Sequence, residues 1–92
     1  MTSKEIKRNP RKFSKEKSGE DQFLILHNDE IHSFDYVIEA LIDVCGHDFV
    51  QATQCTIITH YRGSCDVRRG NLKSLTPLKD ALIRRELNAT ID

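Results

Sequence analysis

The stretch QFLILHNDEIHSFDYVIEALIDVC, residues 22–45, changes from a strand pattern to a helix pattern across a short polar segment. Gln22–His27 is an apolar run of strand length, which is typical of a strand covered by helices. Apolar residues then recur at helical spacing from Phe34, with Ser33 placed to cap the helix and Gly46 to end it. The residues that join strand to helix include an Asn, two acids and flanking histidines. This is more than a plain turn needs, and the surplus indicates a site.

A second helix and a second strand follow. Asp48, with Gln51 three residues later, resembles a capping box and predicts a helix that runs through about His60. Gly63 is a suitable C-terminal cap for that helix. Residues 64–68 then alternate between apolar and polar side chains, which predicts a half-buried strand.

The last part of the chain predicts a turn, a helix and a short strand. Gly70-Asn71 turns the chain, and Thr76-Pro77 opens a helix with proline at its first position. Residues 87–91 alternate as a final strand. The predicted fold class is therefore α+β, an α/β sandwich. Three helices pack on one side of a three-stranded antiparallel sheet, in the order β-α-α-β-α-β.

The chain divides near residue 21. Of residues 1–21 only Ile6 and Phe13 are large and apolar, so this segment cannot bury enough surface to offset the cost of ordering it. We expect it to be a disordered N-terminal extension. It carries seven basic and four acidic residues, whereas residues 22–92 carry seven basic and ten acidic residues. Residues 22–92 are expected to form one small domain.

Composition argues against several classes of partner. Phosphate contacts need clustered basic groups, so we do not expect the net negative part, residues 22–92, to bind nucleic acid. No apolar run approaches the ~20 residues of a membrane span, so no membrane partner is expected. The three cysteines form no C-x-x-C pair, which indicates reduced thiols and a cytoplasmic protein.

Three kinds of site compete for the polar residues. A Cys–His pair for nucleophilic catalysis lacks any recognised local signature, and the histidines and acids match no zinc spacing. Neither a catalytic residue, a metal nor a cofactor is therefore expected. Asn28, Asp29 and Glu30 could instead hold an ammonium group through acceptor oxygens. On these residues alone, a plain Asx turn followed by a capped helix is favoured.

Three segments taken together change this balance. They are LHNDE at residues 26–30, FDYVIEAL at 34–41 and ATQCTIITHYRG at 52–63, and they resemble the ClpS family of protease adaptors. The resemblance covers about residues 22–91. It implies an adaptor, not an enzyme, that recognises N-degrons. Such an adaptor hands substrates to a Clp-type AAA+ unfoldase, of the ClpA or ClpC type, and its ClpP peptidase.

The resemblance also assigns residues. The free α-amino group of a substrate would be held by Asn28, by Glu30 with Asp29 beside it, and by His60. The first side chain of the substrate, bulky and hydrophobic by default, would enter a pocket formed at His32, Phe34, Val37, Thr56, Thr59 and Leu87. In the family the N-terminal extension engages the unfoldase, which gives residues 1–21 an expected role.

Three pocket positions depart from the family pattern. His32 stands where a small Thr is usual, Phe34 where Met is common, and Thr56 where a Met often limits the pocket. Phe34 narrows the pocket and Thr56 widens it, so the preferred N-terminal residue stays open. The alternative function is a small protein–protein interaction module of the same fold that does not recognise a free amine.

Overall fold

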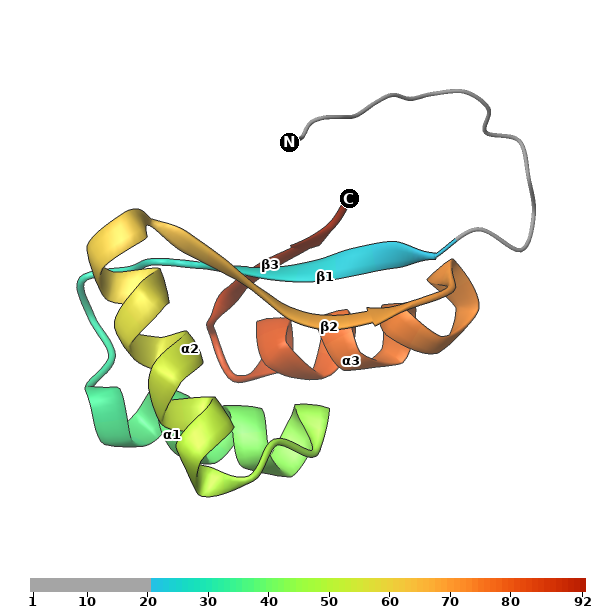
Figure 1. Ribbon diagram of the computed structural model, residues 1–92. Coiled ribbons are helices and arrows are strands. Elements are labelled where there is room, and N and C mark those ends of the chain that lie inside the picture. Colours follow the sequence, from blue (N-terminus) through green and yellow to red (C-terminus); the bar gives the residue numbers. More distant parts are fainter. Residues whose placement is uncertain (1–20) are drawn as a thin grey trace.

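The computed structural model describes residues 21–92, which form three helices and one three-stranded sheet (Figure 1). The expectation of a disordered extension lies outside these residues except at Asp21. The elements are β1 (Gln22–His27), α1 (Phe34–Cys45), α2 (Phe49–Arg62), β2 (Ser64–Gly70), α3 (Leu72–Arg84) and β3 (Asn88–Ile91). The predicted α+β class and element order are confirmed.

The sheet is built around β1. Strands β2 and β3 pair with β1 on either side, both antiparallel. All three helices lie on one side of this sheet (Figure 1). Leu24 and Leu26 of β1 are buried against the helices, whereas Phe23, which precedes Leu24, is 40% exposed. The alternation of side chains along one strand therefore separates the covered face from the open face.

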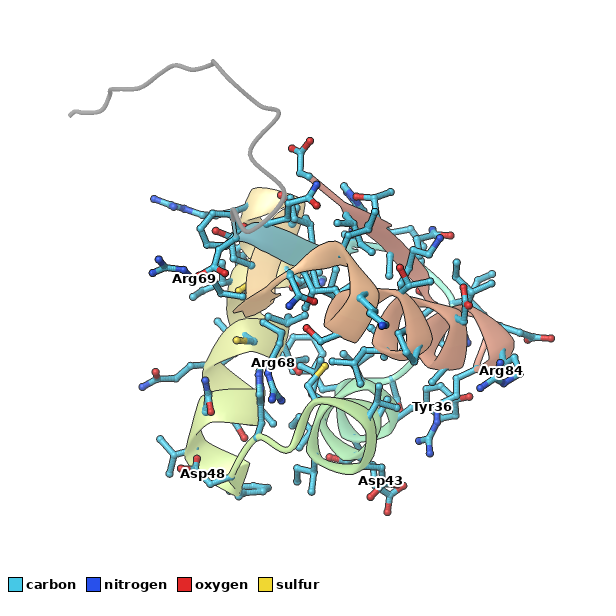
Figure 2. All side chains as sticks on the ribbon, turned by 90° about the vertical axis from the view of Figure 1, so that its right-hand side faces the viewer. Tyr36, Asp43, Asp48, Arg68, Arg69 and Arg84 are labelled. Atoms are coloured by element: carbon cyan, nitrogen blue, oxygen red, sulfur yellow. The ribbon has the colours of Figure 1, made fainter. Side chains whose placement is uncertain are left out.

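The register of β2 against β1 shifts at Val67, which is left as an extra residue in the ladder. Figure 2 shows Arg68 pointing toward the helices and Arg69 pointing away from them. Arg68 donates a hydrogen bond to the carbonyl of Cys45 at the end of α1. Arg69 pairs with Asp21 at 2.9 Å on the other side of the strand. The bulge thus lets β2 hold the end of α1.

The predicted caps of the first two helices are present. Ser33 and Asp48 each accept a hydrogen bond from the third residue of their helix, at 3.1 and 2.7 Å. Gly46 and Gly63 end these helices with φ angles of 72° and 96°, a region that favours glycine. Helix α2 continues beyond His60, which therefore lies in its last turn.

The third helix begins earlier than the sequence indicated. Helix α3 starts at Leu72, where the Asn71 side chain accepts a hydrogen bond from the Ser74 amide at 2.8 Å. The prediction that Thr76-Pro77 opens the helix is therefore wrong. Asn is a good N-cap, and interpreting it as part of a turn hid that signal. Pro77 lies inside the helix and cannot donate to the carbonyl four residues earlier, but that residue is exposed and water can replace the donor.

The core lies between the sheet and the helices. Its fully buried side chains are Leu24, Leu26, Leu41, Leu75 and Leu82, with Cys45 beside them. Leu75 precedes Pro77, so an early start of α3 is needed to place this side chain under the sheet. Across residues 21–92, no helix is both long enough and apolar enough to cross a membrane.

Candidate functional site

The turn after β1 is built around the Asp29 carboxylate. Its Oδ1 accepts hydrogen bonds from the amides of Ile31 and His32, at 2.9 and 3.0 Å. Its Oδ2 pairs with His32 Nδ1 at 3.0 Å. The backbone amide of Asn28 donates to the backbone carbonyl of Gly63 at 2.9 Å, which ties the turn to the end of α2. The turn is therefore fixed both within itself and to the neighbouring helix.

The environment of Asp29 sets its charge state. Burial raises the pKa of this carboxyl group, but the hydrogen bonds from His32 and Ile31 outweigh burial and hold the pKa below its usual value. Asp29 is therefore ionised at neutral pH and acts only as an acceptor. Consequently, the proton in the contact between Asp29 and His32 belongs to His32 Nδ1.

Asn28 and His60 stand at the same end of the molecule. The Asn28 Nδ2 donates to Glu30 Oε2 at 3.1 Å, and no hydrogen bond within residues 21–92 reaches the Asn28 amide oxygen. The ring of His60 lies edge-on to Phe34, with 5.2 Å between ring centroids and 69° between planes. A second edge contact joins His60 to Tyr61 at 4.8 Å. Neither the Asn28 amide oxygen nor the His60 ring therefore has a hydrogen-bond partner within residues 21–92.

A hollow lies beneath these two residues, with about 340 Å³ of empty space between its walls, counting the open mouth. The buried Thr56 and Thr59 belong to the wall, and their hydroxyls donate to carbonyls one turn earlier in α2, at 2.8 and 2.7 Å. A ligand therefore does not need to supply hydrogen-bond acceptors for these hydroxyls. The residues lining the hollow are Leu26, His27, Asn28, Asp29, His32, Phe34, Val37, Thr56, Thr59, His60 and Leu87.

Most of the predicted site residues meet at this hollow. Glu30 does not line it, because its side chain is exposed and its carboxylate accepts from Asn28. Asp29 lines it, although three hydrogen bonds already engage its oxygens. The roles of these residues toward a ligand remain predictions. The geometry separates Asp29, whose oxygens are bonded within the turn, from Asn28, whose amide oxygen has no partner within residues 21–92.

Two lining residues were missed by sequence reasoning. Leu26 and His27 are the last two residues of β1 and reach the hollow because Asn28 follows them directly. The His27 ring is bonded to the Thr90 hydroxyl of β3 at 2.8 Å. The sequence could have identified these two residues only by their position, because the last residues of a strand that ends at a site lie next to that site.

The cysteines lie away from the hollow. Cys45 and Cys55 are buried and Cys65 is half-buried, and all three are free thiols. Burial raises the pKa of Cys45 to about 11 and that of Cys65 to about 12. A protonated thiol is a poor nucleophile. Within residues 21–92, no group of three or more His, Cys, Asp or Glu side chains is arranged to hold a metal ion.

Comparison with known proteins identifies a family and a similar structure. The profile of one family, described as the ATP-dependent Clp protease adaptor protein ClpS, matches residues 17–90. The solved structure of Agrobacterium tumefaciens ClpS2 bound to L-phenylalaninamide is similar, with a TM-score of 0.74 and 18% sequence identity. That match covers 83% of this chain and 98% of the other. No individually curated protein sequence matches at a significant level. The structural likeness shows a shared fold, and the family match, which spans most of the chain, shows that this protein belongs to the ClpS family of Clp protease adaptors.

Proposed function

We propose that this protein binds the free N-terminal residue of substrate proteins and delivers them to a Clp-type AAA+ unfoldase with ClpP. The observation that carries the proposal is one hollow that combines apolar side chains in its wall with two acceptor-bearing side chains, Asn28 and His60. The protein acts as an adaptor and catalyses no reaction itself. Its place of action is the cytoplasm, where Clp-type proteases meet their substrates.

Recognition of the amine rests on the number of donors. A chain N-terminus is a compact ammonium with three donors. The Asn28 amide oxygen and the His60 ring are each a suitable acceptor. Glu30, which holds the Asn28 amide in place, adds a negative charge nearby. A peptide nitrogen in the middle of a chain has one donor and no charge, so it would leave an acceptor unpaired at a cost of about 1–3 kcal/mol. The site would thus select chain ends.

Recognition of the first side chain rests on the walls. Val37 and Leu87 are aliphatic, and the threonine hydroxyls are bonded within α2. A bulky hydrophobic side chain fits such a space better than a polar one, because a polar group would lose its hydration there. The ligand of the similar ClpS2 structure, L-phenylalaninamide, has a free amine and a benzyl group, the two features that these walls and acceptors suit.

A titration separates this function from its alternative. Fluorescence anisotropy would compare peptides that start with Phe or Leu, each with a free and with an acetylated N-terminus. We expect the free forms to bind and the acetylated forms to lose binding, because acetylation removes the charge and two donors. Equal affinity for capped and free peptides would contradict the proposal. It would point instead to an interaction module that does not recognise the amine.

Delivery needs a separate measurement. The rate at which a cognate unfoldase and ClpP degrade a Phe-starting substrate would be followed with and without the full chain. We expect acceleration that is lost when the substrate is acetylated at its N-terminus. Binding without any acceleration would retain amine recognition and reject delivery.

A further inference from the structure

The His32 ring is held on two sides. Its Nδ1 and its backbone amide both bond to Asp29, at 3.0 Å each. One face of the ring stacks on Tyr36, with centroids 4.7 Å apart and planes 18° apart. The Tyr36 hydroxyl in turn donates to the carbonyl of Arg85 at 2.9 Å, and Figure 2 shows Tyr36 beside the end of α3. The His32 side chain is 13% exposed and has little freedom to rotate.

This arrangement leaves one nitrogen of His32 available. Asp29 is an acceptor, so Nδ1 carries the proton of the neutral ring and Nε2 carries a lone pair. Within residues 21–92, no hydrogen bond reaches His32 Nε2. The described side-chain atoms that are enclosed and unpaired are His47 Nδ1 and Thr53 Oγ1, so His32 Nε2 is accessible. His32 lines the hollow. Asp29 covers the Nδ1 edge of the ring and Tyr36 covers one face, so the parts left to line the hollow are the Nε2 edge and the other face.

Several other polar side chains of the wall already make hydrogen bonds within the protein. The hydroxyls of Thr56 and Thr59 donate within α2, and the His27 ring is bonded to Thr90. Asn28 and His60, in the function proposed above, hold the amine at the edge of the hollow. His32 Nε2 has no hydrogen-bond partner within residues 21–92 and can therefore accept from a polar group on a bound side chain.

We infer that His32 makes this pocket prefer an N-terminal tyrosine to an N-terminal phenylalanine, by accepting a hydrogen bond from the phenol. The inference rests on the proposed function, since it assigns the first side chain of an N-degron to this hollow. The two residues differ by one hydroxyl. A phenylalanine ring would cover Nε2 without pairing it. The net value of such a hydrogen bond corresponds to about two- to tenfold tighter binding of tyrosine.

The test compares two peptides that differ only in the first residue, Tyr or Phe, each with a free and with an acetylated N-terminus. Full-length protein is titrated by fluorescence anisotropy. We expect the Tyr peptide to bind more tightly than the Phe peptide. In His32→Phe, which keeps an aromatic ring against Tyr36 but has no nitrogen, the ratio of the two affinities falls to one.

A matched control addresses one of the two threonine hydroxyls in the wall. Thr56→Val removes the hydroxyl of Thr56 and keeps the shape of the side chain. It should change the two affinities by the same factor and leave their ratio as in the wild type. If Thr56→Val abolishes the ratio and His32→Phe does not, the assignment to His32 is overturned.

A second measurement needs no folded variant. The ¹⁵N resonances of the His32 ring in the wild-type chain are recorded with each free peptide. The Tyr peptide should shift the Nε2 resonance as a new hydrogen bond forms, and the Phe peptide should not, while Nδ1 keeps its proton in both complexes. Equal Nε2 responses to the two peptides would overturn the inference.

The outcomes distinguish a failure of the inference about His32 from a failure of the proposed function. Equal affinity for Tyr and Phe peptides, with both lost on acetylation, overturns the role of His32 and leaves amine recognition intact. Binding that survives acetylation overturns the proposed function itself. Tighter binding of Tyr that depends on His32 and on the free amine supports both.

Discussion

Asp29 and Glu30, neighbours in the turn after β1, make different hydrogen bonds. Asp29 engages both of its oxygens inside the protein, whereas Glu30 is exposed and, within residues 21–92, hydrogen-bonds only to Asn28. The sequence places both acids beside the proposed amine site and cannot tell them apart, because the difference depends on which way each side chain turns. The structure reveals the difference through the hydrogen bonds between Asp29 and His32, which fix the His32 side chain in the wall of the hollow. The family motif does not link these two residues.

Asp29→Ala should therefore destabilise the domain. Two amides of the turn would lose their acceptor, and His32 would lose its partner, at a cost of about 1–3 kcal/mol in the free energy of unfolding. Glu30→Ala, one residue further on and exposed, is the matched control and should cost less than about 0.5 kcal/mol. Urea unfolding at neutral pH measures both. Equal losses would show that Asp29 has no special part in the turn.

Acid should remove the contribution of Asp29 to stability. Its folded pKa lies below the ordinary value of 3.8, so the stabilisation is complete above that value. It is lost as pH falls below 3.8 through the folded pKa. The difference in unfolding free energy between wild type and Asp29→Asn should shrink over this range. A difference that stays constant down to about pH 2 would contradict a lowered pKa.

His60→Ala should weaken binding without affecting the fold. The side chain is exposed, so its loss leaves no cavity, but the ammonium of the ligand would lose an acceptor. Affinity for a free Phe-starting peptide should fall about ten- to hundredfold, as expected for a hydrogen bond to a charged group. Gln54→Ala, exposed on the same helix and outside the hollow, is the control. Unchanged affinity with native circular dichroism would remove His60 from the site.

The helices differ in how plainly the sequence specifies them. The N-caps Ser33 and Asp48 are each followed by apolar residues at helical spacing, and both helix starts were predicted correctly. Asn71 follows a glycine, so the pair also fits a turn, and the proline further on is a competing start signal. Leu75, buried at 1% exposure, decides between them through a tertiary contact that local sequence does not reveal.

The start of α3 can be tested by two alanine substitutions. Asn71→Ala removes the cap and should lower the free energy of unfolding by about 1 kcal/mol. Thr76→Ala should cost less, because its hydroxyl only donates to a carbonyl one turn earlier in the helix. If α3 began at Pro77, the order of the two losses would be reversed. Chemical denaturation of both variants gives the order directly.

The whole molecule assembles its site from distant parts of the chain. The hollow draws residues from the end of β1, from α1 and α2, and from Leu87 beside β3. The family motifs made most of these positions predictable, because each motif lies within one continuous segment. The missed positions, Leu26 and His27, carry no motif of their own, and their place follows only from the three-dimensional arrangement.

Removal of residues before Glu20 should separate binding from delivery. The hollow lies wholly within residues 26–87, and a chain starting at Glu20 keeps Asp21 and its ion pair with Arg69. We expect this truncated protein to bind a Phe-starting peptide as the full chain does. We also expect it to fail to accelerate degradation by the cognate unfoldase and ClpP. Acceleration at the full rate would show that the extension has no part in delivery.

The place of β1 in the sheet sets the distance between those two activities. The strand is six residues long and is paired on both sides, so at about 3.3 Å per residue it is a stiff spacer of roughly 20 Å. The chain enters this spacer at Asp21, and the proposed amine site begins at its other end, at Asn28. An unfoldase that binds the chain before Asp21 would therefore not obstruct a peptide bound at the proposed amine site. As long as the peptide stays bound to the adaptor, it would also be held at a high effective concentration near that unfoldase.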